Sequence, residues 1–210
     1  MDRNQVISRN NDSIIGTFNY DIDLLKIHDY FNILSLPIIF VNNWIELLFG
    51  QIFGFDLVFY LFLIYISIDL IWLILKPRAV GSPSTILLHH VISLLGWMIP
   101  LYDNNLMLIT RLALLVEFNT WFNILKRYYK YDFIYNSFYV TWFIFRVLLY
   151  PILLYMSLNG FYTYYFIKGT IFNWSLPVLL ICLTLTFLNY KWSYQLIVKK
   201  GYLGVTSRRD

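Results

Sequence analysis

The sequence predicts an all-α fold, a polytopic transmembrane bundle of about six helices around a central polar cavity open to the cytosol. Of its 210 residues, 59% are hydrophobic and only 13% are charged, whereas a soluble domain carries about 25% charged residues. The hydrophobic residues also form long blocks separated by short charged segments, without the alternating polarity that a β-barrel requires. Helices that each cross the bilayer account for both observations.

Six hydrophobic blocks are long enough to cross the hydrocarbon core, which takes about 20 helical residues. They are residues 31–49, 55–75, 84–101, 105–125, 133–158 and 170–190. Together they form a predicted transmembrane domain, 31–190. A polar amino-terminal region, 1–30, precedes it, and a basic tail, 191–210, follows it.

Polar residues and turn formers set the boundaries of the first three blocks. Pro37 and Glu46 interrupt the first block, so a helix that lies in the membrane interface is the alternative interpretation there. The second block ends at Lys76 and Pro77, and Ser84 is an N-cap candidate for the third. Each boundary therefore has a local chemical reason.

The last three blocks have similar markers. A short turn around Asp103 leads into the fourth block, which Lys126 and Arg127 close. Arg146 and Pro151 lie inside the fifth block, where a proline kinks a transmembrane helix rather than ending it, because neighbouring groups satisfy the freed carbonyls. The sixth block runs into the basic tail.

The distribution of basic residues predicts the orientation. With six spans, every Lys and Arg outside the predicted spans except Lys168 falls on the face that holds both termini. Basic residues in short flanking segments mark the cytosolic side of a membrane protein. Both termini are therefore predicted to be cytosolic.

Polar side chains from three different blocks lie at one depth. Counting about 1.5 Å per helical residue from the nearest cytosolic end places them roughly 8–14 Å below that surface. They are Asp69, His89, His90, Glu117 and Thr120. Asn123 lies three residues after Thr120 and continues a polar stripe toward the cytosol. Groups at equal depth can converge, so we predict a polar cavity at this level.

The embedded arginines differ in position. Arg146 lies near the middle of its block and is predicted to reach inward, to Glu117 or to backbone carbonyls. Arg111 lies closer to the opposite surface, and we expect its side chain to extend into that interface. Each charge inside the membrane costs about 2.5–3.5 kcal/mol, so Asp69, Glu117 and the two arginines would together cost roughly 10–14 kcal/mol if they faced lipid. A polar interior removes most of that cost.

The adjacent histidines His89 and His90 have three interpretations. In the first, one of them is a general base or nucleophile for acyl transfer, oriented by Glu117 or Asp69. In the second, the pair binds a metal, but helical metal sites favour i,i+3 or i,i+4 spacing, and we predict no metal ligands. In the third, they only hydrogen-bond across helices, which spacing alone favours narrowly.

Helical geometry separates the two imidazoles. Adjacent helical residues point about 100° apart, so one histidine is expected to face the cavity and the other to contact a neighbouring helix. His28, the remaining histidine, is assigned to the polar amino-terminal region.

These residues follow the order and spacing of a known family. The matching features are Asp69 two residues after Ser67, the Lys76-Pro77 stop, the His89-His90 pair, and the segment Glu117-Phe118-Asn119-Thr120. In them the chain resembles the TLC domain, which is named for translocating-chain-associating membrane protein, the longevity-assurance ceramide synthases and a ceroid-lipofuscinosis protein. The resemblance covers about residues 56–194. Within it, the residues that fall where similar proteins carry such residues are Arg146, Pro151, Asn189 and Trp192.

The resemblance implies six core helices around a central cavity. In ceramide synthases the two matching histidines lie in that cavity and are needed for N-acyl transfer from acyl-CoA to a sphingoid base. Carried over, the resemblance points to His89 and His90 as catalytic residues, with Glu117 where those enzymes hold an acidic residue. The other polar residues of the predicted cavity are the candidates for binding substrate, namely Asp69, Thr120, Asn123 and Arg146. Thr120 stands where the synthases keep a second aspartate, so this segment is closer to the small TLC-domain proteins linked to membrane phospholipid composition.

Two functions follow as expectations. The leading one is a membrane protein of lipid metabolism or lipid homeostasis that carries out acyl transfer, with acyl-CoA as co-substrate and no bound cofactor. The alternative is a non-catalytic lipid-binding, cargo or translocation-associated protein. Membrane lipids are the expected partners, and nucleic acid is not, because the basic residues flank spans rather than forming a continuous patch. The resemblance implies the endoplasmic reticulum or another internal membrane, or host membranes if the source is a virus.

Overall fold

The computed structural model describes residues 3–50, 56–77, 80 and 82–199, with side chains described from residue 24 to residue 198 within these ranges. Every regular element in this part of the chain is a helix, which confirms the predicted fold class. The predicted boundary residue 55 and most of the basic tail, 200–210, lie outside the described residues.

The chain contains eight α-helices and three short 3-10 or π segments in the described ranges. In order they are α1 (Arg3–Phe49), α2 (Leu57–Leu75), α3 (Pro83–Met98), η2 (Ile99–Leu101), η3 (Asn104–Leu106), α4 (Met107–Leu114), α5 (Val116–Tyr128), α6 (Asp132–Trp142), η4 (Phe143–Leu148), α7 (Leu149–Lys168) and α8 (Ser175–Lys199). Adjacent elements merge, so that the described chain contains six units long and apolar enough to cross a membrane.

The six units agree in number with the six predicted spans, and all but the second are longer. They are Leu24–Phe49, Leu57–Leu75, Pro83–Leu101, Asn104–Tyr128, Asp132–Lys168 and Ser175–Val198. The largest differences lie in the fifth unit, which continues to Lys168 rather than ending at 158, and in the sixth, which begins at Ser175 rather than at 170 and ends at Val198 rather than at 190. Pro37 lies inside α1, which runs through it.

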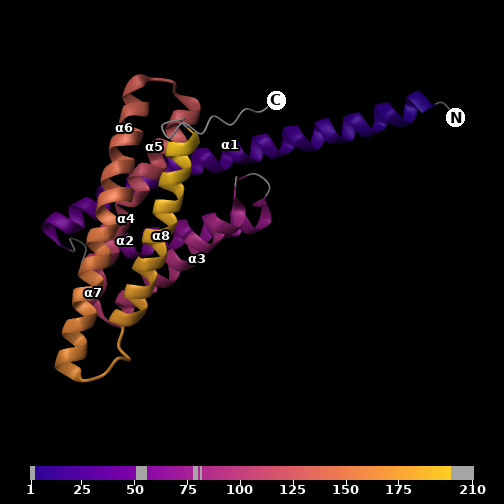
Figure 1. Ribbon diagram of the computed structural model, residues 1–210. Coiled ribbons are helices and arrows are strands. Elements are labelled where there is room, and N and C mark those ends of the chain that lie inside the picture. The colour runs from indigo at the N-terminus through magenta and orange to yellow at the C-terminus, as the bar shows by residue number, and fades with distance from the viewer. Residues whose placement is uncertain (1–2, 51–55, 78–79, 81, 200–210) are drawn as a thin grey trace.

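The helices of the bundle pack against one another in pairs. Helix α5 contacts α1 and α6, α2 lies between α1 and α3, and α8 packs against α3 and α7. Figure 1 shows α6 and α7 end to end in one long rod, with α8 running alongside α7, whereas the amino-terminal part of α1 extends away from the other helices.

The outer surface of the bundle is apolar, unlike that of a soluble domain, and polar groups lie among the hydrophobic residues of its interior. Large apolar side chains such as Ile64, Ile152 and Phe187 are exposed on the outside, whereas polar ones such as Asn119 and Asn189 are buried. An apolar periphery around polar interior groups suits a lipid solvent, because embedded polar groups need partners within the protein. The structure is that of a multi-pass α-helical membrane protein.

Candidate functional site

A cavity of about 290 Å³ lies between α1, α2, α3, α5, η4 and α8. It is lined by all seven residues that the sequence assigned to a site: Asp69, His89, His90, Glu117, Thr120, Asn123 and Arg146. The side chains of Asp69, His89 and Glu117 are buried rather than directed at lipid. The groups that residue counting placed at one depth on separate helices therefore line one cavity.

Asp69 lies between two imidazoles from different helices. Its Oδ1 is 2.5 Å from Nε2 of His28 on α1, and its Oδ2 is 3.3 Å from Nε2 of His90 on α3. The ring of His28 stacks on Trp72, with 3.7 Å between ring centroids. The side-chain amide of Asn32 lies 3.2 Å from the His28 ring nitrogens. The carboxylate therefore joins α1, α2 and α3.

The assignment of His28 to the polar amino-terminal region is wrong. The hydrophobic block begins at Phe31, but the helix that carries it continues toward the amino terminus, so His28 reaches the cavity one turn before that block. Residues of this helix that face the bundle recur with a 3.6-residue period, and this spacing was the signal that the helix begins before residue 31. Along α1 the positions Asp29, Asn32, Leu36, Ile39, Asn43 and Glu46 are all buried.

The two adjacent histidines contact different helices. His90 faces Asp69 on α2, whereas the buried ring of His89 meets Trp192 on α8 edge-on, with 5.4 Å between centroids. Both line the cavity, so the expectation that only one of them would do so is wrong. Among the described residues, the Nδ1 atoms of both histidines are buried without a hydrogen-bond partner.

Arg146 lies in the π segment η4 and points into the bundle. Its Nε donates to Oδ1 of Asn119 (2.7 Å), and its terminal nitrogens donate to Oδ1 of Asn189 (2.8 Å) and Oγ1 of Thr120 (3.0 Å). The inward direction agrees with the prediction. The hydrogen-bond partners of Arg146 are neutral side chains, and Glu117 lies near enough to interact with its charge. A π segment shifts the side-chain phase of a helix and often occurs at functional sites, and a 3.6-residue period does not reveal it.

Asn119 accepts a hydrogen bond from Arg146 and is itself held in place by α6. Its amide nitrogen donates to the carbonyl of Phe138 (3.0 Å) and to Oγ1 of Thr141 (3.1 Å), which leaves its oxygen aimed at Arg146. The sequence placed Asn119 in the family-like segment but did not assign it to the site. Its role depends on α6, whose position relative to α5 no local pattern gives.

Arg127 closes the cavity on the side of α1. Its Nη1 donates to both carboxylate oxygens of Asp29, at 2.9 and 3.0 Å, and the hydroxyl of Tyr128 donates to Oδ2 at 2.9 Å. Asp29 is buried, whereas the side chain of Arg127 is 46% exposed. The pairing with Asp29 holds the guanidinium of Arg127 at the edge of the cavity, where part of its surface stays exposed.

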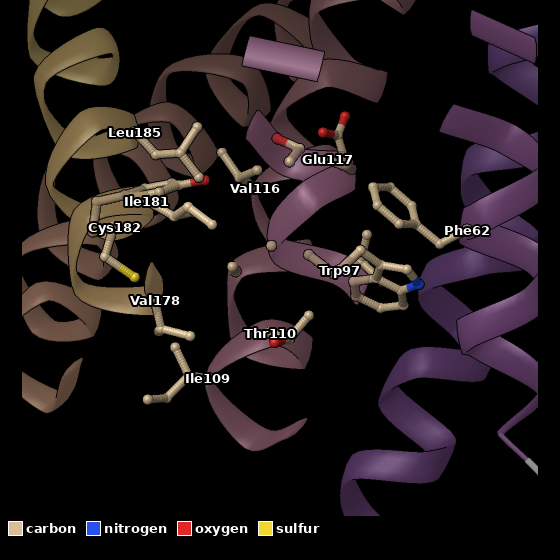
Figure 2. Close-up of a pocket in the computed structure, with 15 residues that line it drawn as sticks. Phe62, Trp97, Ile109, Thr110, Val116, Glu117, Val178, Ile181, Cys182 and Leu185 are labelled. Carbon is tan, nitrogen blue, oxygen red and sulfur yellow. The ribbon is translucent and has the colours of Figure 1, made fainter. Parts of the chain in front are cut away.

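A second, smaller pocket of about 60 Å³ adjoins the polar cavity at Glu117, which lines both. Figure 2 shows Phe62 and Trp97 on one side of this pocket and Ile181 and Leu185 of α8 on the other, with Glu117 at its upper edge. Apart from Glu117 and a few hydroxyl groups, its lining is apolar. The two spaces together present a polar compartment next to an apolar one, with a carboxyl group where they meet.

The expectation for Arg111 is wrong. Instead of extending to the interface, Arg111 is 6% exposed, and its Nη2 lies 2.5 Å from Glu46 and 2.9 Å from Asp56. Asn43 donates to its backbone carbonyl at 3.1 Å. Glu46 is 18 residues after His28 on α1, about 27 Å along the helix axis, so this cluster is separate from the cavity. The carboxylates of Glu46 and Asp56 hold Arg111 inside the bundle. The prediction from its depth in the membrane had named no partner for it.

No three His, Cys, Asp or Glu side chains are arranged to hold a metal ion in the part of the chain that the structure describes. Comparisons with protein-family models, with curated proteins and with solved structures find no match to this chain. The class that the six helical units and their apolar outer surface define is a multi-pass membrane protein with a polar internal cavity.

Proposed function

We propose that the chain is a TLC-type membrane protein of lipid metabolism, and that its two adjoining compartments bind an amphipathic lipid for acyl-CoA-dependent acyl transfer. The observation that carries the proposal is the position of Glu117, which lines both the polar cavity and the apolar pocket. A lipid has the same two parts. Its chain would occupy the apolar pocket while its polar end lies among the ionisable groups.

The cavity supplies the groups that acyl transfer needs. A histidine with an unprotonated ring nitrogen accepts the proton of the acceptor hydroxyl or amine while the acceptor oxygen or nitrogen attacks the thioester carbonyl of acyl-CoA. The carbon–sulfur bond then breaks, and the proton passes from the histidine to the leaving thiolate, which departs as the free thiol of coenzyme A. Of the two histidines, His90 is the proposed base because Asp69 faces its other nitrogen, and Glu117 is the proposed orienting group for the acceptor.

The proposed orientation fits the co-substrate. With both termini in the cytosol, Lys76, Lys126 and Arg127 lie on the cytosolic side, where basic residues attract phosphate groups. Acyl-CoA is a cytosolic molecule that carries several phosphates. An internal membrane such as the endoplasmic reticulum, or a host membrane in the case of a virus, is the proposed location.

One observation favours the alternative, a lipid-binding protein without catalysis. The polar groups of the cavity are largely hydrogen-bonded to one another, for example Arg146 to three neutral side chains. Such a network holds helices together without any substrate.

The experiment that separates the two functions is transfer of a labelled acyl group by the purified protein in lipid nanodiscs, with sphingoid bases and lysophospholipids as acceptors. We expect His90→Gln to lower turnover by about 100-fold or more, the contribution of a positioned general base. Thr163→Ala is the matched control, since Thr163 is exposed on α7 and donates only to a carbonyl of its own helix. Transfer that is equal in all three proteins, or saturable lipid binding with no turnover in any, contradicts catalysis and leaves the lipid-binding function.

A further inference from the structure

We infer that His28, Asp69 and His90 form a relay, in which His28 hydrogen-bonds Asp69, Asp69 pairs with His90, and His28 is a positioning residue. His28 holds the Asp69 carboxylate so that His90 keeps a single tautomer, with its unprotonated nitrogen on the ring edge away from Asp69. The catalytic meaning of this relay rests on the proposed function, whereas the tautomer is a property of the fold.

The relay begins with the two oxygens of one buried carboxylate. An ionised carboxylate only accepts hydrogen bonds, so a ring nitrogen that faces it must carry the proton. The Nε2 atoms of His28 and His90 face Oδ1 and Oδ2 of Asp69 at 2.5 and 3.3 Å. Both imidazoles are therefore assigned the tautomer with hydrogen on Nε2.

Asn32, one turn further along α1, holds His28 in place. Its amide nitrogen lies 3.2 Å from both ring nitrogens of His28 and also donates to the backbone carbonyl of His28 at 3.1 Å. Because Nε2 of His28 donates to Asp69, Nδ1 is the ring nitrogen that is left to accept a hydrogen bond from Asn32.

Nδ1 of His90 is buried and has no hydrogen-bond donor or acceptor as a partner among the described residues. A proton there would leave a buried N–H unsatisfied, which is more costly than leaving the nitrogen unprotonated. The relay therefore leaves the basic lone pair of His90 at Nδ1, on the ring edge away from Asp69.

His28 contributes rigidity to this arrangement. A carboxylate that receives only one hydrogen bond can rotate about its Cβ–Cγ bond, and His90 then loses a fixed partner oxygen. The second donor prevents the rotation, and the stacking of His28 on Trp72 at 3.7 Å fixes the donor in turn. A buried aspartate that holds a catalytic histidine in one tautomer is a known device of serine hydrolases, where the wrong tautomer is strongly damaging. Here a second histidine, on α1, holds the aspartate.

The composition of the chain makes the relay directly observable. The full sequence has three histidines, His28, His89 and His90, so histidine-selective ¹⁵N labelling of the intact protein in nanodiscs gives three pairs of ring-nitrogen resonances. Single Gln substitutions assign them, and the chemical shift of each nitrogen reports whether it carries a proton. In the wild type we expect both His28 and His90 to be protonated at Nε2 only.

Two substitutions at one position test the positioning role. In His28→Leu we expect the His90 resonances to broaden or split into two tautomers, because Asp69 has lost its second donor. In His28→Gln the side-chain amide can donate to Asp69 from nearly the place of Nε2, so the single tautomer of His90 should return. Resonances of His90 that are unchanged in His28→Leu overturn the inference. So does a proton on Nδ1 of His90 in the wild type, whose His90 resonances are assigned from His90→Gln and not from a His28 variant.

The acyl-transfer assay separates failure of the relay from failure of the proposed function. If transfer occurs, His28→Leu should lower kcat by about 10–100-fold, as removal of groups that orient a functional histidine does, with KM little changed and activity recovered in His28→Gln. A single tautomer without any transfer keeps the relay and contradicts the proposed function. Transfer that is equally fast in His28→Leu contradicts the relay and keeps the function.

Discussion

Charged side chains inside this bundle lie where other charges or amides hold them. Arg111 illustrates the rule, since it has two carboxylate partners from different helices, Glu46 of α1 and Asp56 at the start of α2. The sequence showed its depth but not these partners, because Glu46 lies 65 residues earlier (111 − 46 = 65) and the pairing depends on how α1 packs. The depth of a residue in the membrane can be counted from the nearby sequence. Its partner on another helix cannot, because that depends on how the helices pack.

The Arg111 cluster makes a residue-scale prediction. Arg111→Leu should destabilise the protein by about 3–5 kcal/mol, because it leaves two buried carboxylates without their cation. Thermal unfolding in detergent measures the loss, with Lys168→Leu as the control, since Lys168 is an exposed cation at the end of α7. Equal unfolding temperatures for the two variants would show that Arg111 reaches the interface and has no structural partner.

The cavity residues themselves were predictable from the sequence for a physical reason. Each of Asp69, His89, His90 and Glu117 lies within about three turns of a charged or polar helix end, so its depth could be counted reliably. His28 was missed because the predicted span began with the hydrophobic block at residue 31, whereas the helix that carries this block begins earlier in the sequence.

At the scale of the element, α1 is the helix that the sequence described least well. Polar residues interrupt its hydrophobic block, which left an interfacial helix as the alternative. In the structure these residues are part of a buried face, on which Asn43 and Glu46 follow Leu36 and Ile39 at helical spacing. Polar residues inside a hydrophobic block therefore marked the face toward the bundle rather than the end of a span.

Two neighbouring leucines of α1 test that packing. Leu36 is 0% exposed and Leu34 is 69% exposed, so the helix presents one to the bundle and the other to its surroundings. Leu36→Ala should lower the free energy of unfolding by about 2–5 kcal/mol through loss of contacts and the space left behind, whereas Leu34→Ala should change it little. Denaturation in mixed micelles compares them. A helix that lies in the interface would give the same small effect for both substitutions.

At the scale of the whole molecule, the account depends on a bundle that is apolar outside and holds polar groups in its interior. Composition and hydropathy were enough to predict six spans, because the solvent imposes helix length and the satisfaction of backbone groups. They were not enough to predict the apolar pocket beside Glu117. That pocket is formed by side chains from α2, α3, α4, α7 and α8 as well as α5, and its existence depends on packing.

The central claim is that an amphipathic lipid binds inside the bundle, with its chain in the apolar pocket. A lipid with a photoreactive diazirine in its acyl chain, crosslinked in nanodiscs and mapped by mass spectrometry, tests it most directly. Helix α8 supplies both the target and the control, since Ile181 and Leu185 line the pocket while Leu183 and Phe187 are exposed on its outer surface. We predict saturable labelling of Ile181 and Leu185 that excess unlabelled lipid removes. Labelling confined to Leu183 and Phe187, and unaffected by such competition, would contradict the claim.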